Sequence, residues 1–222
     1  MYRKIVGNLL YLTTTRPDLM YAASLLARFM KSPTKKHFGV AKRVLRYVQG
    51  TLNYGIEYVK DKKTILVGFC YADWARNDDD SRSTYGYAFS FGSGVFSWAS
   101  VKQNTVALST TEAKYVSAAE ATAQSIWLRF LVDDFEEMQT DVTPLFCDNM
   151  STISMVKNPI FNQKTRHIRE ALQKGLIDVK FRRSEEQLAN IFTKALPRER
   201  FNYLRHKLGV KAVSSLGEAV EN

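Results

Sequence analysis

Cysteine is scarce in this chain of 222 residues, where only Cys70 and Cys147 occur. Two cysteines do not build a disulfide framework, so the composition is typical of a reducing compartment. Long hydrophobic runs are also missing, since no apolar stretch could span a bilayer and Asn8 interrupts the N-terminal run that faintly resembles a signal peptide. We therefore expect an intracellular protein with no membrane partner and no secretion signal.

Acidic residues are almost absent from the first 60 residues, which hold 11 Lys or Arg but only Asp18 and Glu57. The remaining residues hold 21 basic and 20 acidic side chains, so most of the formal charge of +10 lies in the N-terminal part. A local excess of this kind favours a polyanion such as nucleic acid as partner. The alternative is a solvated basic surface.

Two helices are predicted within this basic part. Pro17 suits a first helical position, and Thr34 suits the N-cap of a second helix over residues 35–49, which Gly50 ends. Apolar residues share one stripe of the second helix, and basic residues cover much of the rest: Lys35, Lys36, Lys42, Arg43 and Arg46. Such a helix pair suits a nucleic-acid backbone; the alternative is a solvated helix packed on the next domain.

Strand and helix patterns follow along the rest of the chain. Strand-like runs cover 55–60, 64–73, 84–91, 95–101, 144–148 and 178–183, and helical runs cover 110–135, 150–156, 185–195 and 198–208. This order predicts an α/β layer fold with a mixed sheet. We expect a basic helical segment over 1–60, a folded domain over 61–210, and a flexible tail over 211–222.

Three carboxylates stand at the edges of separate elements: Asp73 and Asp148 end strands, and Glu112 opens a helix. Convergent carboxylates of this kind are what paired Mg²⁺ or Mn²⁺ ions need for phosphodiester hydrolysis, so the pattern predicts a nuclease. Each has a plain alternative, because Asp73 could form a turn, Asp148 could cap a helix, and Glu112 matches a capping box with Ser109. His167 follows Lys164 and Arg166 in a basic loop, where it could contact a phosphate or simply be solvated.

Motifs over nearly the whole chain, up to about residue 210, resemble one known family. The stretches Tyr2–Leu12, Thr15–Asp18 and Ala41–Thr51 resemble the end of a Ty1/copia-type reverse transcriptase. Downstream motifs resemble its ribonuclease H (RNase H) domain: Ala72–Ala75, Ser83–Tyr87, Ser97-Trp98, Lys102-Gln103, Ser109–Ala113, Cys147–Asn149, Lys164–Ile168 and Gln187–Lys194. The resemblance thus assigns 1–60 to the end of the reverse transcriptase or its connection segment, and 61–210 to an RNase H-like domain.

This resemblance implies an RNase H-like five-stranded mixed sheet flanked by helices. It implies cleavage of the RNA strand of an RNA–DNA hybrid with two Mg²⁺ or Mn²⁺ ions, for which Glu112 and Asp148 match family metal ligands and Asp73 is the third candidate. The implied partners are an RNA–DNA hybrid or other nucleic acid and the rest of a retrotransposon Pol polyprotein, in a cytoplasmic virus-like particle or the nucleus. The chain lacks a Tyr/Phe-Xaa-Asp-Asp polymerisation motif, and we expect it to be a fragment of a longer polyprotein.

Two positions depart from the family pattern. Tyr71 replaces the first acid of an Asp-Ala-Asp-Trp stretch, and Asn190 replaces the acid of a Leu-Ala-Asp-Ile-Phe-Thr-Lys stretch. Tyrosine offers no carboxylate and asparagine only a neutral oxygen, while we place Asp73 on the opposite face of its strand. These changes predict an impaired RNase H site. The alternatives are a catalytically dead nucleic-acid-binding remnant and a reused, non-enzymatic interaction protein.

Overall fold

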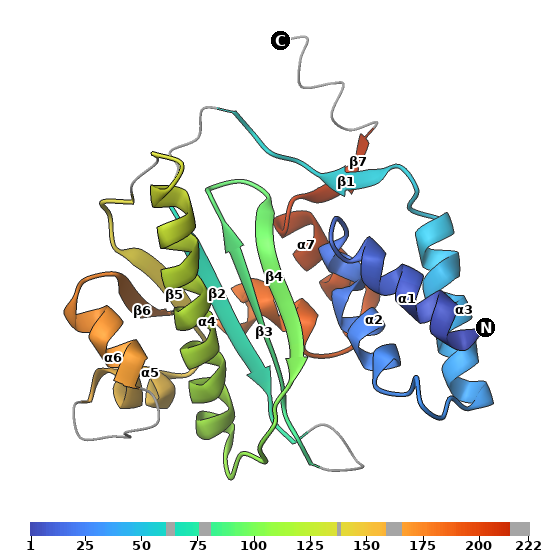
Figure 1. Ribbon diagram of the computed structural model, residues 1–222, viewed down its shortest axis with the longest axis horizontal. Helices are drawn as coiled ribbons and strands as arrows, with labels where there is room; N and C mark the ends of the chain where they lie inside the picture. Colours follow the sequence, from blue (N-terminus) through green and yellow to red (C-terminus); the bar gives the residue numbers. More distant parts are fainter. Residues whose placement is uncertain (61–64, 76–80, 137–138, 159–165, 214–222) are drawn as a thin grey trace.

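A five-stranded mixed sheet forms the centre of the computed structural model, which describes residues 1–60, 65–75, 81–136, 139–158 and 166–213 (Figure 1). The strand order is β4-β3-β2-β5-β6. The strands are β2 (Val67–Asp73), β3 (Thr84–Ser90), β4 (Val95–Lys102), β5 (Thr143–Cys147) and β6 (Ile177–Phe181). β3 is antiparallel to β2 and β4, whereas β5 is parallel to β2 and β6. The predicted five-stranded mixed sheet is confirmed.

Helices cover both faces of this sheet because its strands are apolar on both faces. Cys70 faces a core that includes Tyr115 and Leu128, whereas Tyr71 faces a second core that includes Phe192 and Leu204. The first core is covered by α4 (Thr110–Asp133), α5 (Met150–Lys157) and α6 (Arg166–Gln173), and the second by η4 (Leu188–Phe192) and α7 (Arg198–Lys207). Within this three-layer arrangement, the parallel pairing of β2 with β5 places their C-terminal ends at the same edge of the sheet.

The segment after β6 differs from its prediction. The helical run predicted over 185–195 is instead two 3₁₀-helices, η3 (Ser184–Glu186) and η4. Gly86 on β3 explains how closely η4 lies on the sheet, because a Cβ there would be only 2.5 Å from the Phe192 Cβ. The tight approach therefore requires glycine at this position.

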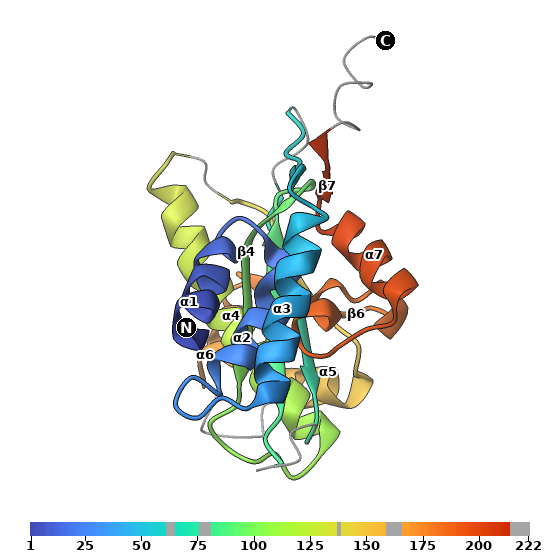
Figure 2. The same cartoon turned by 90° about the vertical axis from the view of Figure 1, so that its right-hand side faces the viewer.

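The N-terminal segment consists of α1 (Tyr2–Leu12), η1 (Pro17–Leu19), α2 (Met20–Ala27) and α3 (Lys35–Gln49). Thr34 caps α3 as predicted, and its side chain and that of His37 form a reciprocal capping box. Buried residues of the three helices form their own core: Tyr2, Val6, Leu9, Leu19, Ala23, Leu26, Ala41 and Val44. Figure 2 looks onto these helices, with α7 beside α3.

Contacts cross the predicted boundary between residues 60 and 61. The Trp98 indole donates to the Thr13 carbonyl at 3.0 Å, and the Ser24 hydroxyl donates to the Ser100 carbonyl at 2.7 Å. β1 (Tyr54–Ile56) pairs antiparallel with β7 (Val210–Ala212) outside the main sheet. The strand predicted over 55–60 is therefore shorter, and the tail predicted from 211 begins inside a paired strand. In the described part of the chain, no helix is long and apolar enough to cross a membrane.

Candidate functional site

Asp148 lies at the C-terminal end of β5, beside the end of the parallel strand β2. Its side chain is only 1% exposed, although it carries a charge. Asn149, and not Asp148, is the N-cap of α5, because the Asn149 side chain accepts a hydrogen bond from the Thr152 amide at 2.7 Å. Helix capping therefore does not account for Asp148, whose carboxylate is turned into the protein.

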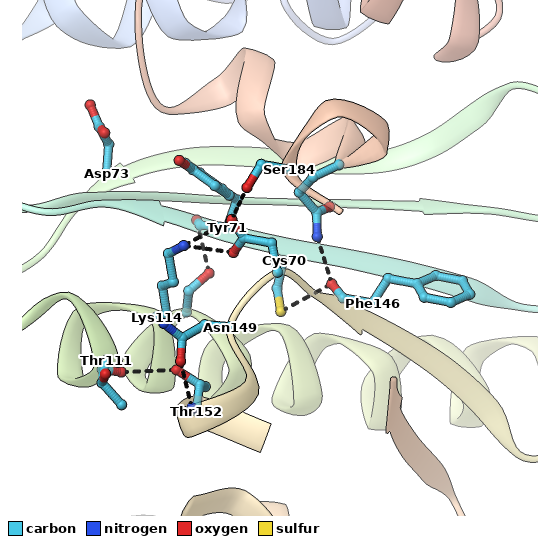
Figure 3. A network of polar contacts seen from close by, with 12 residues as sticks. Cys70, Tyr71, Asp73, Thr111, Lys114, Phe146, Asn149, Thr152 and Ser184 are labelled. Carbon is cyan, nitrogen blue, oxygen red and sulfur yellow. Dashed lines mark hydrogen bonds and ion pairs between the residues drawn. The ribbon is translucent and has the colours of Figure 1, made fainter. Parts of the chain in front are cut away.

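The Asp148 carboxylate is held by two groups from different elements (Figure 3). The Lys114 ammonium on α4 lies 2.8 Å from each carboxylate oxygen and donates to Oδ2. The Ser184 hydroxyl on η3 donates to the same Oδ2 at 2.6 Å. Sequence reasoning overlooked both partners. The signal that could have found Lys114 is its helical spacing, because Lys114 is three residues before Ser117 and so lies on the same face of α4. That face contacts β2, where the Ser117 hydroxyl donates to the Tyr71 carbonyl at 3.0 Å.

Tyr71 is buried between β2 and the segment after η4, and it has two ammonium groups beside it. The Lys114 ammonium lies 4.9 Å and the Lys194 ammonium 5.0 Å from the centre of its ring, both within cation–π range. Lys194 also donates to the Tyr71 hydroxyl at 3.0 Å. The position at which the family pattern has an acid is therefore an aromatic ring that attracts cations from the protein itself.

Asp73 lies on the same face of β2 as Tyr71, which corrects the prediction that the two occupy opposite faces. Side chains alternate along a strand, so residues two apart share a face, and no bulge interrupts the pairing of β2 with β3. Lys194 contacts both residues, with its ammonium 3.6 Å from the Asp73 Oδ1. In Figure 3 the Asp73 side chain stands apart from Lys114 and Ser184.

The Glu112 residue forms hydrogen bonds at the start of α4. The Ser109 hydroxyl accepts from the Glu112 amide at 3.1 Å, and the Glu112 carboxylate accepts from the Leu108 amide at 2.7 Å. The reach back to Leu108 differs from an ideal capping box, in which the amide of Ser109 itself would be bonded. Glu112 thus stabilises the helix start, and its assignment as a metal ligand stays a prediction.

Asn190 lies on η4 and is 6% exposed. Its side-chain Oδ1 is buried and has no hydrogen-bond partner among the described residues. The Asn190 backbone carbonyl accepts hydrogen bonds from the Thr193 amide and hydroxyl, at 3.2 and 3.1 Å. The side-chain Oδ1 is a neutral oxygen, so it supplies no charge for a cation.

The acidic residues do not fit a pair of divalent ions. Within the described residues, no group of three or more Asp, Glu, His or Cys side chains is placed to hold a metal. Mg²⁺ and Ca²⁺ need oxygen ligands at about 2.0–2.6 Å, but an ammonium already lies against both oxygens of Asp148. The buried Cys70 thiol does not help, because a hydrogen bond with Cys147, and then burial, raises the pKa of Cys70 well above its usual value. The residues present therefore do not fit a two-metal centre.

The residues predicted to contact nucleic acid fall into two groups. All five basic residues on α3 are exposed: Lys35, Lys36, Lys42, Arg43 and Arg46. In the second group, Lys164 lies outside the described residues and Arg166 is the first residue of α6. His167 is in this helix and not in a loop, and its Nε2 lies 3.1 Å from the Ala119 carbonyl on α4. Packing of α6 on α4 thus accounts for His167 without a ligand.

Comparisons with known proteins point to retrotransposons. No family model matches the chain. The retrovirus-related Pol polyprotein from transposon RE1 of Arabidopsis thaliana is 38% identical over 96% of this chain, which spans only 15% of that polyprotein. Secreted RxLR effector protein 161 of Plasmopara viticola is 45% identical over 57% of this chain and 90% of its own length.

Among solved structures, the N-terminal RNase H domain of a Mycobacterium tuberculosis protein matches with a TM-score of 0.42 and 8% identity, over 64% of this chain and 97% of that one. The extended match to Pol sequences decides the family, because it runs through both the N-terminal helices and the sheet. The chain belongs to the Pol polyproteins of copia-type retrotransposons, as a segment of about 15% of their length.

Proposed function

We propose that this chain is the RNase H-type segment of a copia-type Pol polyprotein, and that it binds RNA–DNA hybrid or related nucleic acid without cleaving it. The observation that carries the proposal is the ion pair between Lys114 and Asp148. In an otherwise retained fold, it engages the carboxylate that is best placed to bind a metal ion. Two-metal cleavage needs carboxylates that hold one ion to activate water and another at the leaving 3′ oxygen. Asp148 is engaged, and Tyr71 and Asn190 bring no charge.

Binding does not depend on those carboxylates. The exposed basic residues of α3 suit contacts with phosphates, which position a protein on nucleic acid without reading its sequence. Their apolar neighbours Ala41 and Val44 are buried against α1 and α2, so the basic face is presented by a packed helix. We expect affinity for the backbone that falls steeply as the salt concentration rises.

Fluorescence anisotropy with a labelled RNA–DNA hybrid, titrated at several salt concentrations, tests this proposal. Lys42→Glu should weaken binding several-fold and make its salt dependence shallower, because one phosphate contact is replaced by a repulsion. Lys174→Glu is the matched control, since Lys174 is an exposed lysine that follows α6 and is not on α3. A folded wild-type chain with no affinity for the hybrid at low salt would refute the proposal.

A second candidate is a non-enzymatic interaction protein. The similarity to a protein named as a secreted effector, over 90% of that protein's length, favours it. The same titration, repeated with labelled single strands, separates the two functions. A chain that is folded but binds neither hybrid nor single strands would favour the interaction function.

A further inference from the structure

We infer that Lys114 is a built-in cation, which takes the place of a divalent ion beside Asp148, and that Lys194 supplies a second positive charge between Tyr71 and Asp73. The inference deepens the proposed function and rests on it only for the origin of the site. Its tests measure stability and the response to metal, and not nucleic-acid binding. Either proposal can therefore fail while the other holds.

The fold aims Lys114 at the strand ends. Ser109 fixes the start of α4, and one turn beyond Lys114 the Ser117 hydroxyl fastens the helix to the Tyr71 carbonyl at 3.0 Å. Residues three apart lie on one face of a helix, so Lys114 projects toward the same strand. Its side chain is 15% exposed, and most of its length is therefore covered by protein.

Asp148 needs such a cation. A carboxylate that is 1% exposed has lost nearly all its contact with water, and an isolated charge in that position is strongly unfavourable. The Lys114 ammonium lies 2.8 Å from both oxygens, and the Ser184 hydroxyl donates to Oδ2 at 2.6 Å. A divalent ion would have to displace this ammonium, because two cations at so short a distance repel each other.

Lys194 repeats the arrangement on the more open side. Its ammonium bonds the Tyr71 hydroxyl at 3.0 Å and lies 3.6 Å from the Asp73 carboxylate. The ammonium groups of Lys114 and Lys194 both lie about 5 Å from the centre of the Tyr71 ring. Tyr71 therefore joins the two ion pairs into one cluster. Each carboxylate of the cluster thus has an ammonium of the protein beside it, so the fold has no need of Mg²⁺ there.

Thermal melts of Lys114→Met test the first part, because methionine keeps much of the lysine's shape and removes the ammonium with its charge and its hydrogen bond. We expect Tm to fall by about 6 °C or more, since a buried carboxylate is left without its partner. Lys157→Met is the matched control, because Lys157 pairs with Asp178 at 3.3 Å and is 51% exposed. Its Tm should change by no more than about 2 °C. Equal effects of the two variants would overturn the inference.

A second variant keeps the test decisive if Lys114→Met does not fold. Adding Asp148→Asn removes the uncompensated charge, so the double variant should fold and recover most of the lost Tm. A double variant that remains as unstable as Lys114→Met would contradict an ionic role for Lys114.

The response to metal tests the replacement itself. Wild-type Tm should be the same in EDTA and in millimolar MgCl₂ or MnCl₂. Lys114→Glu should be less stable in EDTA and gain about 4 °C or more with metal, because a bound ion would then balance the two carboxylates. A metal-induced rise in wild-type Tm that Asp148→Asn abolishes would overturn the inference, and so would a Lys114→Glu variant that ignores metal.

Discussion

Asp18 is a buried carboxylate whose partners join the two ends of the chain. Arg16 donates to it through two nitrogens, at 2.9 and 2.8 Å, and the Tyr47 hydroxyl donates to it at 2.6 Å. Arg205 on α7 in turn donates to the Tyr47 hydroxyl at 2.9 Å. Bidentate hydrogen bonds between arginine and a carboxylate are stronger than hydrogen bonds between neutral groups. Here they hold the turn between α1 and α2 against α3.

Asp18→Asn should destabilise the protein by about 3–5 kcal/mol, because it leaves the Arg16 guanidinium buried without its counter-charge. The free energy of unfolding in urea measures the effect. Asp178→Asn serves as the control, since the Asp178 side chain is 39% exposed and its change should cost no more than about 1 kcal/mol. If Asp18→Asn lowers the free energy of unfolding as little as Asp178→Asn does, the buried ion pair contributes little to stability.

Tyr47 predicts a dependence of stability on alkaline pH. Burial, and then the nearby Asp18 carboxylate, raises the pKa of Tyr47 to about 12 from its ordinary value near 10. Because the folded pKa exceeds the unfolded one, the contribution of Tyr47 is fully present below about pH 10 and is lost as the pH rises towards 12. Melts from pH 9 to 12 should fall less steeply for Tyr47→Phe than for wild type, and parallel curves would contradict the assignment.

At the scale of elements, the contact between η4 and β3 depends on Gly86. Gly86→Ala places a methyl group 2.5 Å from the Phe192 Cβ and 3.0 Å from the Ala99 carbonyl, so backbone must shift. We expect a loss of about 1–3 kcal/mol in the free energy of unfolding. Gly39→Ala, on the exposed side of α3 with nothing within 4 Å, should be neutral or stabilising by up to about 1 kcal/mol. Equal effects would argue against the tight contact.

On the scale of the whole molecule, the N-terminal and C-terminal segments are fastened to each other. β1 pairs with β7, and the Lys211 ammonium bonds the Glu57 carboxylate between these strands. The Arg205–Tyr47 hydrogen bond adds a second connection between the same two segments. We therefore expect residues 1–60 to unfold together with the sheet, although the sequence divides them into two domains.

Differential scanning calorimetry tests this cooperativity. A single transition is expected for the full chain, and removal of residues 1–56 should lower the Tm of the remainder by several degrees, because β7 loses its partner strand. Two separate transitions, or a truncated chain as stable as the full one, would instead support independent domains.

Periodicity and capping predicted the sheet and its long helix because both signals are local. Thr34 and Ser109 marked helix starts, and alternating apolar runs marked β2 to β6. The β1–β7 pair was missed because its two strands are three residues each and more than 150 residues apart. The 3₁₀ form of the segment after β6 was missed because a contact with Gly86, distant in sequence, decides it.

The candidate site was sought at its acids, and the cations beside them were overlooked. Asp148 was placed correctly at the strand end, since a strand followed by a polar residue is readable in sequence. Lys114, Ser184 and Lys194 come from a helix, a 3₁₀ turn and a connecting segment, so only the fold brings them together. Charge state at a buried site depends on such distant neighbours.

Incubation of the purified chain with labelled RNA–DNA hybrid and Mg²⁺ or Mn²⁺, with binding and cleavage read from the same samples, distinguishes a binding protein from a nuclease. We expect a retained complex and an intact RNA strand, because the Lys114 ammonium pairs with the Asp148 carboxylate. Metal-dependent cleavage by the wild-type chain that disappears in Asp148→Asn would contradict it, since Asp148 would then serve a metal ion despite its lysine partner.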